Sequence, residues 1–324
     1  MRAIALCAQV RTRYRIKILA HNSLAKHLIV YIDAALWYST FEMEITSSAR
    51  LAKASASNCD RKTEQVTLKP PLKWAGGKRW LVPFISAYWE KQLSPRLVEP
   101  FCGGLSVALN LQPEKALLND VNPHLINFYE QVKRGLRLTI AAKYDTTIYY
   151  RHRQRFNDLI KNNGADAETA QLFYYLNRTC FNGLCRFNQS GEFNVPFGSY
   201  SSNLKYAQDF TPYQALFRKW TFSNTDFERL RLRPDDFVYA DPPYDVEFTT
   251  YSQGGFSWND QERVALWLSQ HPGPVILSNQ KTKKIVELYR DLGYKLKFRK
   301  APRRISCTGD RTQAMEVLAL RNLE

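Results

Sequence analysis

The stretch RLVEPFCGGLSVALNLQPEKALLND (residues 96–120) decides the fold class of this 324-residue chain. A short apolar run over 96–104 ends in two glycines, and the segment 105–111 that follows can open a helix. The next apolar run, over 115–120, ends in an acid. A strand, a glycine turn, a helix and another strand form the repeating unit of a parallel sheet. The stretch therefore predicts an α/β fold.

The rest of the chain continues this alternation. Strands are predicted over 220–227, 236–243 and 274–279, and a closing hairpin over 294–300 and 314–322. A long, largely helical stretch is predicted over 122–180, and another helix over 258–271, with Asn259 as its N-cap and Glu262 completing a capping box. Ligands of parallel sheets bind at the carboxyl ends of the strands. The segment 99–104, Asp120, Asp226 and Asp241 all lie at such ends.

Charge and composition limit the classes of partner. The chain has 46 basic and 30 acidic residues, a formal charge of +16, which favours a polyanion such as nucleic acid. The alternative is a basic protein without such a partner. The six cysteines form no C-x-x-C pair and the five histidines show no ligand spacing, so we expect no disulfide framework, no metal and a reducing cytosol. The most apolar run, 27–41, is too short for a membrane span and contains Asp33.

Residues 1–68 differ from the remainder. The segment SSARLAKASASNCDRKTEQ (47–65) is polar and rich in small residues, as linkers are. We therefore expect 1–68 to be an N-terminal extension that is poorly ordered.

Two glycine motifs precede the helical stretch. In KWAGGKRW (73–80), Leu72 and Arg79 stand where a phosphate-binding loop needs glycine and Ser or Thr, so the motif is either a turn that brings Trp74 and Lys78 to a ligand or a surface loop. The motif EPFCGG (99–104) is not the dinucleotide fingerprint, although its glycines would let a ligand approach a helix start. Asp120 could accept hydrogen bonds from two ribose hydroxyls or could cap the next helix.

The tetrapeptide DPPY (Asp241, Pro242, Pro243, Tyr244) ends a predicted strand. The Asp241 carboxylate and the Pro242 carbonyl could both accept hydrogen bonds from one planar amine, and Tyr244 could stack on the ring that carries it. Holding both amine hydrogens would direct the nitrogen lone pair at an electrophile. This would be catalysis by positioning and electrostatics, without a strong base.

Together, K-W-A-G-G-K, E-P-F-x-G-G, N-D-x-N and D-P-P-Y resemble the Dam-type (D12-class) DNA adenine methyltransferases over about residues 71–322. The resemblance implies a Rossmann-like S-adenosylmethionine-dependent methyltransferase sheet (69–130 and 216–324) with an inserted, mainly helical DNA target-recognition domain (131–215). It implies methyl transfer to the 6-amino group of an adenine flipped out of double-stranded DNA, with GATC as the expected site. It also implies a cytoplasmic, nucleoid-associated enzyme, which we expect to be monomeric. Its biological role would be DNA methylation, alone or as part of a restriction-modification system.

The resemblance assigns roles residue by residue. Asp241, Pro242, Pro243 and Tyr244 would be catalytic. The donor would be bound by Trp74, Lys78, Glu99, Pro100, Phe101, Gly103, Asp120, Asp226, Phe227 and Asp241.

The segment LNRTCFNGLCRFNQSGEFNVPFG (176–198) resembles the recognition hairpin of this family. DNA contacts would come from Lys73, Phe181, Asn182, Leu184, Arg186 and Pro196. Arg186 could contact a guanine edge or instead a phosphate, and Phe181 could fill the space left by the flipped base or instead join a small aromatic core with Tyr174, Tyr175 and Phe187. Leu184 and Pro196 could touch a thymine methyl group.

The chain departs from the family at Leu105, where many relatives have glycine, at Phe181 and Phe187, where close relatives often have tyrosine, and at Gln189-Ser190, where a basic residue is common. Two other functions remain: methylation of an amide or of RNA, where asparagine typically replaces Asp241, and DNA binding without catalysis. The intact DPPY argues against both.

Overall fold

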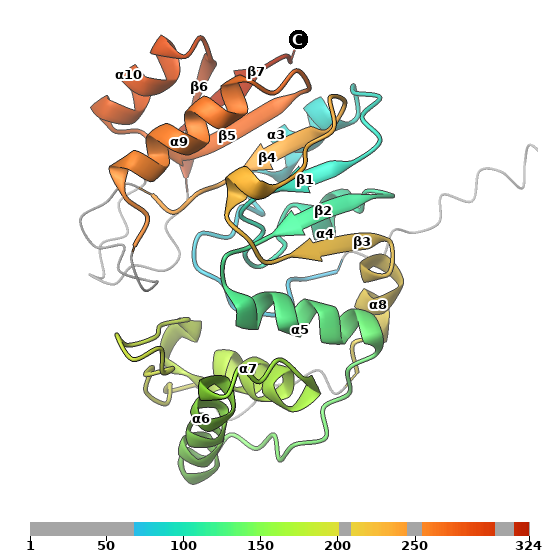
Figure 1. The fold of residues 1–324 in the computed structure, drawn as a ribbon, viewed down its shortest axis with the longest axis vertical. Coiled ribbons are helices and arrows are strands. Elements are labelled where there is room, and N and C mark those ends of the chain that lie inside the picture. The colour runs from blue at the N-terminus through green and yellow to red at the C-terminus, as the bar shows by residue number, and fades with distance from the viewer. Residues whose placement is uncertain (1–67, 201–208, 245–254, 302–313, 324) are drawn as a thin grey trace, which may run out of the picture. The chain divides into compact units, whose positions relative to one another are not determined.

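Seven short segments form one mixed sheet in the computed structural model, which describes residues 68–200, 209–244, 255–301 and 314–323 (Figure 1). The predicted extension, apart from Leu68, lies outside these residues. The strands are β1 (Leu97–Glu99), β2 (Ala116–Asn119), β3 (Trp220–Ser223), β4 (Phe237–Ala240), β5 (Val275–Gln280), β6 (Lys295–Ala301) and β7 (Ala314–Arg321). Their order is β3-β2-β1-β4-β5-β7-β6. The first five are parallel and β7 is antiparallel to both neighbours, which confirms the predicted α/β class and closing hairpin.

The central strands are buried along their whole length. Every residue of β1, β2 and β4 is buried, as expected for parallel strands covered on both faces. The order of connection reverses at β1, which pairs with both β2 and β4. The carboxyl ends of β1 and β4 therefore lie side by side, at the point where such sheets bind ligands.

Eight α-helices occur in the described residues, and they surround the sheet or extend from its β3 edge (Figure 1). The predicted helical stretch over 122–180 is three helices, each with a side-chain N-cap: Asn122, Asp145 and Asp166. The helices are α3 (Val82–Trp89), α4 (Ala108–Leu111), α5 (Pro123–Arg134), α6 (Thr146–Lys161), α7 (Ala167–Thr179), α8 (Thr211–Phe217), α9 (Trp258–Ser269) and α10 (Lys283–Asp291).

The helix over 258–271 is real, but its predicted cap was wrong. Ser257 is the N-cap and Asp260 completes the capping box, whereas Asn259 lies inside α9. Both candidate caps have a carboxylate three residues later, so the sequence pattern fits either register. Ser257 has the extended backbone that an N-cap needs, with ψ of 171°.

The helix after the glycine turn begins later than predicted, at Ala108 instead of residue 105. Leu105 has φ of 60°, in the left-handed region, and is fully buried. A left-handed backbone costs a non-glycine residue roughly 1–2 kcal/mol, which explains why glycine suits this position. Burial of the leucine side chain offsets this cost here.

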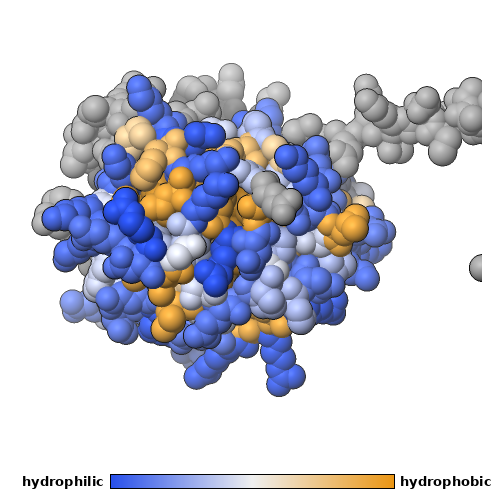
Figure 2. All heavy atoms as spheres, turned by 90° about the horizontal axis from the view of Figure 1, so that it is seen from above, coloured by the Kyte–Doolittle hydropathy of each residue, from blue (hydrophilic) through white to orange (hydrophobic). Residues whose placement is uncertain are grey.

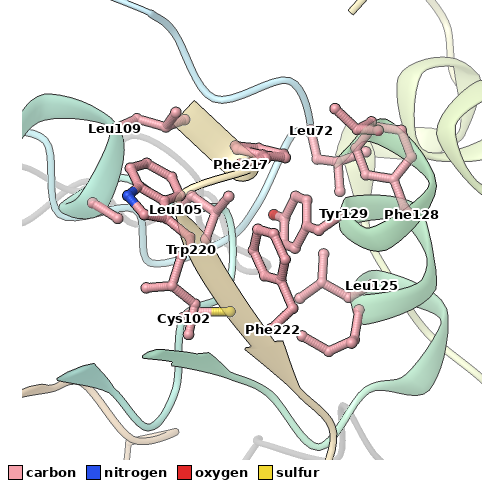
Figure 3. Packing of buried hydrophobic residues seen from close by; sticks show 14 of the residues in the cluster. Leu72, Cys102, Leu105, Leu109, Leu125, Phe128, Tyr129, Phe217, Trp220 and Phe222 are labelled. Atoms are coloured by element: carbon pink, nitrogen blue, oxygen red, sulfur yellow. The ribbon is translucent and has the colours of Figure 1, made fainter. Parts of the chain in front are cut away.

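The core between α5 and β3 reaches the glycine turn (Figure 3). Tyr129, Phe217 and Phe222 pack ring against ring, with centroids 5.2–5.8 Å apart. The Tyr129 hydroxyl donates a hydrogen bond of 2.7 Å to the Gly103 carbonyl. Packing of the core thus fixes the position of the turn after β1.

The edge strand β6 carries Lys295, Lys297, Arg299 and Lys300, and hydrophilic residues cover much of the face seen from that side in Figure 2. Basic side chains on an edge strand discourage pairing with other chains.

At the amino end of β4, the buried Asp236 binds Arg96 through both carboxylate oxygens, at 2.8 and 2.6 Å. No helix among the described residues is long and apolar enough to cross a bilayer.

Candidate active site

Asp241 lies directly after β4, where the chain leaves the sheet. Its Oδ2 forms an ion pair of 2.8 Å with the Nζ of Lys78, and its Oδ1 accepts a hydrogen bond of 2.8 Å from the hydroxyl of Ser278, a residue inside β5. The Lys78 ammonium also donates to the Gly76 carbonyl at 3.1 Å. The K-W-A-G-G-K loop and DPPY, more than 160 positions apart in the sequence, therefore meet in one site.

Tyr244 completes a cluster around Lys78. The Lys78 Nζ lies 4.7 Å from the centre of the Tyr244 ring, within reach of a cation–π interaction. The Tyr244 hydroxyl donates a hydrogen bond of 2.6 Å to Oε1 of Glu316, a buried residue of β7. Burial raises the pKa of Glu316, and the nearby Lys78 partly opposes this rise.

A buried chain of amides holds the DPPY turn. Gln261 of α9 donates to the Pro243 carbonyl at 2.7 Å, and Asn279 of β5 donates to Gln261 at 2.8 Å and to the Tyr289 hydroxyl at 3.1 Å. Gln261 and Asn279 are fully buried. Buried, satisfied networks rigidify the groups that they bind, so this chain fixes the path of the backbone beyond Pro242.

The turn after β1 packs against Trp74. A methyl group added at Gly103 would lie 2.8 Å from the Trp74 Nε1, and one added at Gly104 would lie 2.8 Å from its Cβ. Gly103 also has φ of 43°. Glycine is therefore needed here for close approach of the indole and for the backbone conformation.

Glu99, the last residue of β1, and Pro100, which follows it, both form hydrogen bonds with buried partners. Glu99 is buried and its Oε1 accepts from the amide of Ala108, the first residue of α4, at 2.8 Å. Burial raises the pKa of Glu99 to about 8. The Pro100 carbonyl accepts from the Asn119 side chain at 2.9 Å.

Asp120, half-buried at the end of β2, ties the turn to the next helix. Its Oδ2 accepts from the Gly103 amide at 3.1 Å and its Oδ1 from the Asn122 amide at 3.0 Å. The cap of α5 is Asn122, so the alternative reading of Asp120 as that cap is wrong. Burial raises the pKa of Asp120 to about 6.

Aromatic rings cluster shortly after the ends of β1 and β3. Phe101 contacts Phe227 and Phe256, with centroids 5.5 and 5.7 Å apart. Asp226 caps the short helix that begins at Phe227 and forms an ion pair of 3.0 Å with Arg263. The predicted donor residues after β1, β2 and β3 thus include both an aromatic surface and carboxylates.

The segment 180–198 folds back on itself as a hairpin. Antiparallel bridges join Cys180 to Phe197 and Phe187 to Phe193, and Asn188 closes the tip by accepting from the Glu192 amide at 2.8 Å. The exposed Arg186 donates through Nε to the Asn194 side chain at 2.8 Å. This bond joins the two arms of the hairpin.

Phe181 projects from the hairpin with 48% of its surface exposed. Tyr174 and Tyr175 are buried, at 2% and 0%, and Phe187 stacks on His124 with centroids 5.1 Å apart. Phe181 therefore stands outside the aromatic core that was the alternative to a DNA contact. Its neighbour Asn182 is exposed with φ of 53°.

Lys73 lies at the base of the hairpin. Its Nζ donates to the Arg178 carbonyl at 3.1 Å and lies 3.5 Å above the Tyr200 ring. Desolvation lowers the pKa of Lys73 to about 8. The other predicted DNA contacts differ in exposure, with Leu184 packed against the core and Pro196 exposed.

Sequence reasoning missed four side chains of the DPPY cluster and turn. Ser278, Asn279 and Glu316 lie on strands whose remaining residues are mostly apolar, and Gln261 lies on an amphipathic helix. A polar residue inside a buried strand is the signal that could have found the first three. No group of three or more metal-ligating side chains occurs in the described ranges.

Comparison with known proteins connects these motifs to a family. The model of the family described as "D12 class N6 adenine-specific DNA methyltransferase" matches residues 74–305 of the chain. The chain is 34% identical to the retron Ec67 DNA adenine methylase of Escherichia coli and 36% identical to a DNA adenine methylase of Vibrio cholerae, over 77% of this chain and 90% and 94% of those proteins.

A third relative is the DNA N-6-adenine-methyltransferase of Escherichia phage P1, 35% identical over 77% of this chain, which spans only 35% of the phage protein. The magnesium protoporphyrin IX methyltransferase of Synechocystis, solved with bound SAM, is 12% identical over 76% of this chain and 80% of that one, with a TM-score of 0.31. On the family match and these sequence identities, the chain belongs to the D12 class of N6 adenine-specific DNA methyltransferases.

Proposed function

We propose that this protein transfers a methyl group from S-adenosylmethionine to the 6-amino group of an adenine in double-stranded DNA, within GATC. The observation that carries the proposal is the convergence of Lys78, Asp241 and Tyr244 at the switch point of the sheet, in a chain of this family. The site supplies hydrogen-bond acceptors and an aromatic face, which together suit a planar amine.

The Asp241 carboxylate and the Pro242 carbonyl accept the two amine hydrogens. Each carboxylate oxygen has about two lone-pair positions, so the bonds from Lys78 and Ser278 leave capacity for the amine. Tyr244 stacks on the base, and the amide chain through Gln261 keeps the turn in place. With both hydrogens held, the nitrogen lone pair points away from the ring plane and toward the methyl donor.

The residues around the turn fit S-adenosylmethionine, which supplies an electrophilic methyl group when bound. Carboxylates at the ends of β2 and β3, Asp120 and Asp226, suit hydroxyl and amine groups, and the Phe101 and Phe227 rings suit an adenine face. Lys78 and Trp74 connect this region to the DPPY site. No metal is part of the proposed reaction.

The hairpin and the charge of +16 support duplex DNA as the substrate. We assign base readout to Arg186, with Lys73, Asn182, Leu184 and Pro196 as further contacts, and the plug for the flipped base to Phe181. The helical region over 131–215 is the proposed recognition domain. A monomer acting on nucleoid DNA in the cytoplasm completes the proposal.

Tritiated methyl donor and duplexes with and without GATC test this function. Transfer to the GATC duplex alone supports the whole proposal, whereas transfer to other sequences refutes only the site. The Asp241→Ala variant should lose transfer and retain DNA binding in a mobility-shift assay. Absence of transfer to any DNA, with the donor still bound, refutes the function.

A further inference from the structure

Glu316 is an unusual residue for its position. It lies in β7, opposite Gln280 of β5 and Arg299 of β6, and only 5% of it is exposed. The next four residues of β7, Val317 to Leu320, are apolar and buried. A carboxylate in such a strand costs stability unless its charge is paired, so its presence points to a use.

The contacts of Glu316 lead to the proposed reaction site. Its Oε1 accepts from the Tyr244 hydroxyl at 2.6 Å and lies 3.7 Å from the Lys78 Nζ. Its other oxygen, Oε2, is buried and forms no hydrogen bond among the described residues. Among the described residues, the contacts of the carboxylate to Tyr244 and Lys78 are thus made by Oε1.

The bond to Tyr244 restricts the ring. Rotation about the Cβ–ring bond leaves the hydroxyl in place, but any swing of the side chain moves the hydroxyl away from Glu316. Short bonds to a carboxylate are about twice as strong as bonds between neutral groups. The Lys78 ammonium, 4.7 Å from the same ring, lies near the carboxylates of both Glu316 and Asp241 and offsets their mutual repulsion.

We infer that Glu316 is a positioning residue for methyl transfer: it holds the Tyr244 ring where it can stack on the target adenine beside Asp241. The inference rests on the proposed function. The role assigned to Glu316 needs no contact with the substrate: the carboxylate reaches the site through the Tyr244 hydroxyl, with the Lys78 ammonium as its second, more distant neighbour at 3.7 Å. Its contribution is to the orientation of the bound base, and hence to the rate of transfer more than to DNA affinity.

Four variants test the inference: Glu316→Gln, Glu316→Ala, Tyr244→Phe and the double variant Glu316→Ala/Tyr244→Phe. The control is Glu287→Gln, a solvent-exposed glutamate of α10. Single-turnover transfer to a GATC duplex gives the rate constant, equilibrium titration gives the Kd of duplex and of donor, and thermal unfolding checks the fold.

We expect Glu316→Ala to lower the transfer rate constant on the order of 10- to 100-fold, the scale of loss that follows from a misplaced reacting group, with both Kd values within about twofold of wild type. Glu316→Gln should recover part of the rate, because its amide oxygen can still accept from Tyr244. In the Tyr244→Phe background the Glu316→Ala change should have little further effect, since the two residues act through one bond.

A folded Glu316→Ala protein with the wild-type rate constant would overturn the inference. The same factor of loss in the Tyr244→Phe background would also overturn it, because Glu316 would then not act through the tyrosine. These results require an active wild-type enzyme, so they are distinct from failure of the proposed function, in which wild type transfers no methyl group to any DNA.

Discussion

Loss of the Ser278 hydroxyl is the sharpest test of how Asp241 is oriented. Ser278 donates 2.8 Å to Asp241 Oδ1 and is joined at 3.1 Å to the Tyr239 hydroxyl, and it is fully buried. A hydrogen bond to a charged group contributes about 1.5–3 kcal/mol. If that bond holds the carboxylate in its reactive orientation, Ser278→Ala should lower the single-turnover rate constant by roughly 10- to 150-fold, at about 1.4 kcal/mol per factor of ten.

The assay compares Ser278→Ala with Tyr239→Phe on a GATC duplex at saturating donor. Tyr239→Phe removes a hydroxyl that touches Ser278 but leaves the bond to Asp241 in place, so it should lose much less activity. Both variants should bind DNA as wild type does, because neither residue lies on the hairpin. A Ser278→Ala enzyme within twofold of wild type, in a preparation where Asp241→Ala is inactive, would refute the orienting role.

Three further predictions concern stability and DNA contact. Burial raises the pKa of Glu99 to about 8 from its ordinary 4.5, so between these two pH values the native state binds one proton more than the unfolded state. The free energy of unfolding of the wild type should therefore fall as the pH rises from 4.5 to 8, by up to about 1.4 kcal/mol per pH unit. Urea unfolding should show that Glu99→Gln removes this slope, and a difference in unfolding free energy between the two proteins that stays constant with pH would contradict the argument. Asp236→Ala leaves Arg96 without its carboxylate partner at the amino end of β4 and should lower the free energy of unfolding by roughly 3–5 kcal/mol, measured by urea unfolding. A loss below ~1 kcal/mol would show that water solvates Arg96 in place of the carboxylate. Phe181→Ala should weaken the complex with a duplex carrying 2-aminopurine at the target by about 1–3 kcal/mol and reduce its fluorescence increase, and an unchanged signal would remove Phe181 from the role of plug.

The strands and turns of the sheet could be predicted from the sequence because short, local patterns of residues determine them. The apolar runs at 96–104, 115–120 and 236–243 each contain a strand that is buried throughout, and the glycines after β1 mark a real turn. Boundaries were less readable, because tertiary contacts decide them. The start of α4 depends on a left-handed Leu105 that core packing tolerates, and the start of α9 depends on which of two similar capping patterns is adopted.

Residues of the candidate site could be predicted from the sequence only where several of them fall in one short motif. DPPY and K-W-A-G-G-K identify Asp241 and Lys78, yet nothing in either motif states that the two side chains form an ion pair. That contact depends on the tertiary fold, in which the loop before α3 meets the chain just after β4. The resemblance assigned Lys78 to the donor, and the structure places its ammonium against the carboxylate that is proposed to receive the target amine.

Ser278 and Glu316 show why residues that support the site cannot be predicted from motifs. Each is a polar residue in a mostly apolar strand, and its role depends on the strand order. Strand β5 lies beside β4, and β7 lies beside β5, so both side chains reach DPPY at the edge of the sheet where β4 ends. A one-residue shift in either strand would turn the hydroxyl or carboxylate to the opposite face of the sheet. The register of β5 and β7 is therefore as much a part of the proposed active site as the tetrapeptide, and substitutions that alter that register should impair transfer without changing any residue that touches DNA.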